Sequence, residues 1–296
     1  MPRPPSPLPR SLTRRPFTTA EALALALPAA RLRTADLSRP FHGVRAHRAA
    51  VTLEELAQAY AARMPEHEMF THTTAASIHG MRMPDHFAET LLHVAAAAPH
   101  PPPRSRGVVG HRYERQLGAT MIGGLRTARP VDAWVQCASI LALDDLIVMG
   151  DGLIRRHGAV TTMAELELHV GSLHGLRGII TMRLALAEMR SRTDSPKETT
   201  LRLLVTRAGF PEPEVNGEIR NEYGAVIAHG DLVFRAQKLV LEYDGGVHRQ
   251  PRQHFLDIYR LDEIMEEGWR VIRVDKYMVA NPFTLFAKLR RALATR

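Results

Sequence analysis

Cysteine is almost absent from this sequence of 296 residues, in which Cys137 stands alone. An internal disulfide framework is therefore excluded, and the cysteine usage is typical of a reducing cytoplasm. No apolar run approaches the roughly 20 residues that a membrane-spanning helix requires, so we expect a cytoplasmic protein with no membrane partner. The opening MPRPPSPLPRSLTRRP lacks the apolar segment of a secretory signal. Residues 1–16 are predicted to be a disordered basic tail. The alternative is that the start codon is placed too early and that these residues are not translated.

Acidic residues are also scarce relative to basic ones, with 31 Asp and Glu against 39 Lys and Arg and a formal charge of +8. Such an excess favours a polyanionic partner, and DNA is the commonest one. The alternative is compositional, because Arg-rich and Ala-rich proteins of high-GC genomes are often basic without binding nucleic acid. Charge alone leaves both interpretations open.

The N-terminal region, residues 17–50, has the order of a small winged helix-turn-helix. TTAEALALAL (18–27) predicts a helix that begins at a Thr cap, AARLRTADL (29–37) a second helix, and RPFHGVRAHR (39–48) a short basic strand. Arg31, Arg33 and Arg45 would then contact DNA. A plain helical hairpin that caps the next domain explains the same pattern.

Residues 51–192 predict a mixed α+β middle region. The segment 89–98 is strand-like, and 108–114 is expected to be its antiparallel partner across the loop HPPPRSRG. The histidines of this region have no recognised metal-ligand spacing and are interpreted as surface or core residues: His72, His79, His93 and His111. The Ser/Asp/Pro cluster at 191–196 marks the expected domain boundary.

Residues 195–296 predict the element order α-β-β-β-α-β-α. A helix with Ser195 at its N-cap precedes strands at 214–220, 225–234 and 238–245, and a helix at 252–268 leads to a strand at 269–275 and a last helix at 282–294. The crossover through the helix at 252–268 should make a parallel strand pair. The expected class is therefore α+β or α/β, with a restriction-endonuclease-like C-terminal core.

Three carboxylates lie in or beside these strands. If the second and third strands pair about the turn at 236–237, opposite residue numbers sum to 473, and Asp231 lies across from Glu242. Asp244 shares a face with Glu242 because residues two apart in a strand point the same way. Like charges at this spacing repel, whereas a bound Mg²⁺ or Mn²⁺ would reverse the sign. The pattern predicts a metal site.

Two further residues have two interpretations each. Glu198 fits an ordinary capping box with Ser195, and it also fits a role in the site. His248 either donates a proton or positions water beside the acids, or it is a solvated loop residue. Arg249 and Arg252 follow it and are expected to contact DNA. The cations of the last helix complement its dipole.

Asp231, Glu242-Tyr243-Asp244 and the helical Glu198 together resemble the core of PD-(D/E)XK nucleases. The stretch LEYDGGVHR…FLDIYRLDEIMEEGWRVIRV is similar to very-short-patch-repair-type endonuclease domains found as C-terminal modules in actinobacteria. The region 17–160, with RPFHGVRA, more loosely resembles abortive-infection type IV antitoxins.

The nuclease resemblance implies metal-dependent hydrolysis of DNA, with Asp231 and Glu242 as ligands of Mg²⁺ or Mn²⁺. The sequence departs from the signature in two places: Gly230 precedes Asp231, and Asp244 stands where a Lys is usual. Asp244 would be a further ligand, and His248, Lys238 or Lys276 would supply the missing cation. The expected function is a repair-like or defence-associated endonuclease, and a cognate toxin or defence-system protein is a further expected partner.

Two alternatives remain. In one, the protein is an antitoxin-like DNA-binding regulator whose nuclease fold is catalytically silent. In the other, the acids form a solvated strand end with no ligand, and the register of Asp231 with Glu242 argues against this last interpretation. No heptad seam predicts an oligomer.

Overall fold

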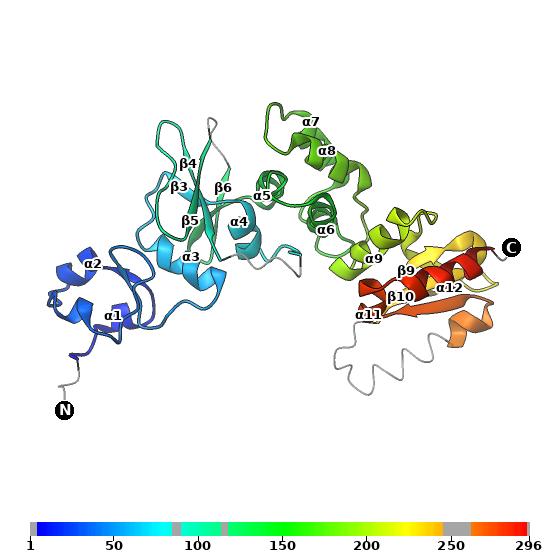
Figure 1. The fold of residues 1–296 in the computed structure, drawn as a ribbon, viewed down its shortest axis with the longest axis horizontal. Helices are drawn as coiled ribbons and strands as arrows, with labels where there is room; N and C mark the ends of the chain where they lie inside the picture. Colours follow the sequence, from blue (N-terminus) through cyan, green and yellow to red (C-terminus); the bar gives the residue numbers. More distant parts are fainter. Residues whose placement is uncertain (1–4, 85–89, 114–117, 245–261, 295–296) are drawn as a thin grey trace. The chain divides into compact units, whose positions relative to one another are not determined.

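The computed structural model describes residues 5–84, 90–113, 118–244 and 262–294 (Figure 1). The chain forms two compact units, one of residues 1–141 with 175–179 and one of residues 142–174 with 180–296. The predicted mixture of helices and sheets is confirmed. Among the described residues, no helix has the length and apolarity needed to cross a bilayer.

The first unit begins with short elements around a small core of Leu12, Phe17, Ala22 and neighbouring leucines. The predicted Thr cap is confirmed, because the Thr18 side chain accepts from the Glu21 N–H at the start of the first predicted helix. The elements are α1 (Arg10–Thr13), β1 (Phe17–Thr18), α2 (Thr19–Ala24), the 3₁₀ turn η1 (Arg31–Arg33) and β2 (Val44–Arg45), with β1 and β2 antiparallel.

The prediction of a helix at 29–37 is wrong, because only the 3₁₀ turn η1 forms there. The reason lies in Arg31, whose side chain is 6% exposed and turns inward. Its guanidinium donates to the Ser6 carbonyl at 2.6 Å and to both carboxylate oxygens of Asp36 at 2.9 and 2.7 Å. These contacts hold the segment in a tight turn that ends in extended backbone at Thr34.

A five-stranded sheet in the order β5-β4-β3-β7-β6 follows. One face packs against α3 through Tyr60, Phe70, Leu92 and Val94, and the other packs against α4 and α5 through Met69, Ala75 and Ala133. The elements are α3 (Leu53–Ala61), β3 (Glu68–Phe70), α4 (His72–Ile78), β4 (Leu92–Ala97), β5 (Val108–Tyr113), β6 (Ala119–Ile122), β7 (Leu125–Ala128) and α5 (Pro130–Cys137).

The expected antiparallel pairing of β4 with β5 is wrong, because the two strands are parallel, from Leu92 beside Val108 to Ala97 beside Tyr113. The connecting segment 98–107 is rich in proline, which favours extended chain. Ten residues at about 3.1 Å each reach roughly 31 Å, more than the roughly 20 Å length of a six-residue strand. The chain therefore returns to the start of β4 before β5 begins.

The second unit starts with three helices, α6 (Leu143–Leu153), α7 (Met163–Gly171) and α8 (Ile179–Glu188). Asp151 of α6 is fully buried and accepts from the Arg190 N–H at 2.7 Å and the Thr199 hydroxyl at 2.9 Å. It also lies 3.4 Å from the Arg202 guanidinium, which is 2% exposed. Burial raises the pKa of Asp151 to about 6, against the opposing effect of Arg202. This network joins α6 to the helix that follows the 191–196 cluster, so that cluster lies within the second unit.

The predicted strand and helix order of the C-terminal region is confirmed for the described residues. The sheet order is β11-β10-β9-β8, with β10 and β11 parallel as the crossover predicted and the other pairs antiparallel. Helix α11 was not predicted. The elements are α9 (Pro196–Arg207), β8 (Glu214–Arg220), β9 (Val226–Phe234), β10 (Leu239–Tyr243), helical residues 262–266, β11 (Arg270–Val274), α11 (Lys276–Ala280) and α12 (Phe283–Ala294).

Two glycines face each other in this sheet, Gly217 of β8 and Gly230 of β9. A Cβ atom on Gly230 would lie 2.5 Å from a methyl carbon of Val240, and one on Gly217 would lie 3.0 Å from Val233. The valine side chains therefore cover the space that side chains at the two glycines would occupy.

Candidate functional site

The predicted register of β9 and β10 is confirmed. Leu239 pairs with Phe234, Val240 with Val233 and Leu241 with Leu232, so the paired numbers sum to 473. The same register continued by one residue brings Asp231 level with Glu242. The Asp231 carboxylate accepts a hydrogen bond of 2.8 Å from the Tyr243 N–H. Asp231, Glu242 and Asp244 are all half-buried.

The polar row continues from Asp231 onto β8. Asn216 lies between the paired positions Val215–Leu232 and Gly217–Gly230, so it is level with Asp231. Its φ of 47° is a left-handed conformation that asparagine tolerates better than most residues. This turns its amide toward α9, where it donates to Glu198 Oε2 at 2.6 Å.

Glu198 itself is 5% exposed and lies in the first turn of α9. Its N–H donates to the Ser195 hydroxyl, as in the predicted cap, while its carboxylate accepts from the Asp194 N–H at 2.8 Å. Ser195 therefore caps the helix as predicted, and the Glu198 carboxylate bonds the N–H one residue before the cap and the Asn216 amide.

A basic residue that the sequence did not single out lies on the other side of Glu242. Arg273 of β11 is the parallel partner of Glu242, so the two side chains share a face of the sheet. Arg273 is exposed. The predicted parallel crossover indicated that β11 lies beside β10. The sequence does not show which residue of β11 pairs with Glu242.

The two lysines considered as replacements for the missing signature Lys lie in different places. Lys238 precedes β10, about 13 Å of strand from Glu242, and its ammonium donates to the Glu267 carbonyl at 2.9 Å. The prediction that Lys238 supplies the positive charge of the missing signature Lys is therefore wrong. Lys276 follows β11 at the end where the Asp244 N–H donates to the Val274 carbonyl.

The predicted site residues His248, Arg249 and Arg252 lie outside the described residues. Within the described ranges, one group of three potential metal ligands lies close together, and Asp231, Glu242 and Asp244 are not part of it. The metal role of these acids stays a prediction.

The arginines expected to contact DNA differ in exposure. The prediction that Arg31 contacts DNA is wrong, because its guanidinium is buried against Asp36. Arg45 is half-buried and donates to the Leu32 carbonyl at 2.7 Å. Arg33 is exposed and remains accessible.

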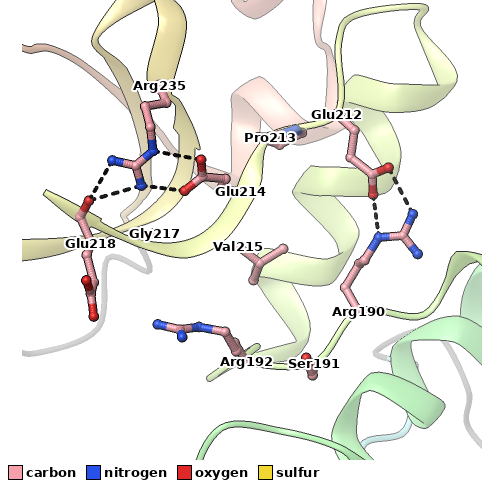
Figure 2. Close-up of a pocket in the computed structure, with 10 residues that line it drawn as sticks. All are labelled: Arg190, Ser191, Arg192, Glu212, Pro213, Glu214, Val215, Gly217, Glu218 and Arg235. Carbon is pink, nitrogen blue, oxygen red and sulfur yellow. Dashed lines mark hydrogen bonds and ion pairs between the residues drawn. The ribbon is translucent and has the colours of Figure 1, made fainter. Parts of the chain in front are cut away.

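A pocket of about 450 Å³ lies along the edge strand β8 and the segment after α8 (Figure 2). Arg235 pairs with Glu214 and donates to the Glu218 carbonyl, and Arg190 pairs with Glu212. None of the described residues that line it is one of the predicted acids. Its charges are largely paired within the wall, which gives it no strong preference for an ion of either sign.

Three histidines far apart in the sequence come together in the first unit. His72 begins α4, His93 lies in β4 and His111 lies in β5, and one potential ligand nitrogen from each lies within 4.8 Å of the others. Nδ1 of His93 is 2.9 Å from Nε2 of His111, and the rings of His72 and His111 are stacked with centroids 3.9 Å apart. We call these residues the histidine cluster.

The sequence interpretation of these histidines was incomplete. His72 and His93 are buried, as a core role requires, yet they also form a ligand-like group with His111. The group depends on the parallel pairing of β4 with β5, in which His111 lies beside Ala95 and so shares a face with His93. Since the antiparallel partner was expected, no spacing in the sequence indicated the cluster.

Burial lowers the pKa of His72 to about 2 and that of His111 to about 4, and repulsion from neighbouring imidazoles adds to both effects. Both rings are therefore uncharged at neutral pH. The lone pair of an uncharged imidazole can accept a proton or bind a metal ion.

Comparison with protein families gives no matching family model. Two curated relatives are each 26% identical over 246 residues, which cover 82% of this chain and 87% of the relative. Both are described as uncharacterized proteins of Mycobacterium tuberculosis, one from strain CDC 1551 / Oshkosh and one from strain ATCC 25618 / H37Rv. The similarity therefore extends across both units.

Proposed function

We propose that the protein is a metal-dependent DNA endonuclease whose site lies on the sheet of the second unit. The observation that supports the proposal is the register of β9 and β10, whose last pair is Leu241 with Leu232, directly before Glu242 and Asp231. Arg273 flanks Glu242, and Asn216 with Glu198 continues the row beyond Asp231. Carboxylate oxygens on adjacent strands are the type of ligand that a divalent cation prefers.

The donor set fits Mg²⁺ or Mn²⁺, which prefer carboxylate oxygens and retain bound waters. Asp231 and Glu242 would hold the ion, and Asp244 would add an oxygen from the end of β10. A bound ion would activate water and stabilise the leaving oxygen of a phosphodiester. Arg273 supplies a fixed positive charge beside Glu242 for a phosphate oxygen, and Glu198 holds Asn216 and so orients the row.

The experiment is incubation of the full chain with supercoiled plasmid and added Mg²⁺ or Mn²⁺. We expect nicking or linearisation that requires the metal, is lost in Glu242→Ala and Asp231→Asn, and is retained in Glu222→Ala. Glu222 is an exposed acid in the turn between β8 and β9 and serves as the matched control. Cleavage that survives Glu242→Ala would contradict the proposal.

The second candidate function is DNA binding without cleavage, as in an antitoxin-like regulator. A pocket of about 440 Å³ in the first unit favours it, because the described residues that line it include Arg39, Arg45 and Arg106 but no carboxylate. Metal-independent binding of duplex DNA with no cleavage would support this function. Loss of binding in Arg106→Ala, with Glu242→Ala unaffected, would separate it from the nuclease.

A further inference from the structure

The histidine cluster lies in the first unit and has no part in the proposed nuclease site. Its three side chains come from a helix start and two strands, and the surrounding backbone is fixed. The His72 N–H donates to Gln136 Oε1 at 2.9 Å, the Thr71 N–H to the His93 carbonyl at 2.9 Å, and the His93 N–H to the Thr74 hydroxyl at 2.8 Å. The rings are therefore held in place from several directions.

The backbone at His72 supports a special role for this position. Its φ of 49° is left-handed, a conformation that is strained for most residues other than glycine. Such strain persists where the surrounding structure enforces it, and it clusters at ligand and active sites. At His72 it turns the imidazole toward His93 and His111.

Ring orientation adds a second argument. Nδ1 of His72 lies 3.1 Å from the Thr71 hydroxyl, and donation of its N–H to that oxygen leaves Nε2 as the nitrogen with a lone pair. Metal-binding histidines commonly donate their other ring N–H in this way. Close by, the buried Nε2 of Gln136 and Oγ1 of Thr73 make no hydrogen bond within the described part of the chain.

We propose that His72, His93 and His111 bind a divalent transition-metal ion, with Zn²⁺ as the preferred occupant. Imidazole nitrogen suits Zn²⁺, and tetrahedral coordination with bonds of about 2.0–2.1 Å places ligand nitrogens about 3.3 Å apart. That separation lies between the 2.9 Å of the closest nitrogen pair and the 4.8 Å that bounds the group. A hard ion such as Mg²⁺ prefers oxygen ligands and does not fit.

A fourth coordination position would face solvent on the side of His111. His111 is half-exposed and lies on β5, the edge strand of the sheet, whereas His72 and His93 are buried. The ion would enter past His111 and retain a water there. Three protein ligands and one water are the composition of catalytic rather than structural zinc sites.

The test is competition of the metal-stripped full chain with a chromophoric chelator for Zn²⁺, with visible absorption of the Co²⁺ form as a second readout. We expect one ion per chain. His111→Ala, and His72→Asn, which keeps a residue suited to left-handed backbone, should each weaken Zn²⁺ binding by at least the roughly 10–100-fold that loss of even an outer-shell partner costs.

Two control variants test whether Zn²⁺ binds at the histidine cluster rather than at another histidine or at the proposed nuclease site. His100 belongs to an exposed stacked pair with His67 in the same unit, and His100→Ala should leave Zn²⁺ binding unchanged. Glu242→Ala should also leave it unchanged while it abolishes any cleavage of DNA. Failure of the wild-type chain to bind Zn²⁺ would overturn the proposal, and so would undiminished Zn²⁺ binding in both cluster variants. Circular dichroism checks that each variant is folded.

Discussion

Glu198 connects local and long-range structure through a single carboxylate. One of its oxygens accepts both the Asp194 N–H at the start of α9 and the Asn216 side chain from β8. Because the residue is 5% exposed, water does not replace these bonds when the carboxylate is removed. The cap by Ser195 is confirmed, and a role of Glu198 in the site stays a prediction.

Glu198→Ala should lower the free energy of unfolding by about 1–3 kcal/mol, because it removes the acceptor of the buried Asn216 amide and of the part-buried Asp194 N–H. Glu198→Gln retains one acceptor oxygen and should lose less. Urea denaturation measures both. Glu165→Ala is the control, because Glu165 forms an exposed capping box at α7 and should lose only about 1 kcal/mol. Equal losses at the two positions would show that Asn216 contributes nothing.

At the scale of elements, α6 and α9 are joined by a buried pair of charges. Asp151 and Arg202 have side chains that are 0% and 2% exposed. Their mutual attraction is offset by the cost of removing both from water, so the intact pair adds little net stability. Its effect is on which helices pack together, because either charge alone is strongly unfavourable in that position.

Asp151→Ala should lower the free energy of unfolding by about 3–5 kcal/mol, because it removes the fully buried carboxylate that compensates Arg202 and leaves only the more exposed Glu212 beside that guanidinium. Asp144→Ala, in the same helix, removes the exposed partner of Arg207 and should lose no more than about 1 kcal/mol. Chemical denaturation of the two variants side by side tests the difference. A loss at Asp151 as small as that at Asp144 would mean that Glu212 alone compensates the charge of Arg202.

Elements defined by local patterns were predicted well, and those defined by distant contacts were not. The strands 226–234 and 239–243 follow from alternating side chains and a short turn, which also fix their register. By contrast, the turn at Arg31 depends on a side chain reaching Ser6 and Asp36, and the direction of β5 depends on where a proline-rich segment leads. The histidine cluster needed that direction, so it was missed as well.

At the scale of the whole molecule, the formal charge of +8 favours DNA as the partner in both proposals. The charge acts through side chains that reach solvent, and arginines that are close in sequence differ in this respect. Arg33 is exposed, whereas Arg31 is buried within the protein. Counting basic residues therefore overestimates the number that meet a phosphate.

Arg33→Ala should reduce the slope of log K against log salt for duplex DNA by about 0.9, the value for one released counterion, without changing stability. Arg31→Ala should instead lower the free energy of unfolding, because it leaves Asp36 and Ser6 without their donor. Fluorescence anisotropy of labelled DNA over a range of NaCl concentrations measures the slope. An unchanged slope in Arg33→Ala would exclude this region from the contact.

The glycines that face each other in β8 and β9 restrict how related sequences can vary. A homologue with any side chain at position 230 would need residues smaller than valine at 240 and 233, and one with a side chain at 217 would need the chain near Val233 to shift by a few tenths of an ångström. These positions should therefore change together over evolutionary time or not at all. An alignment deep enough to include such exchanges would report the packing of this sheet without a structure.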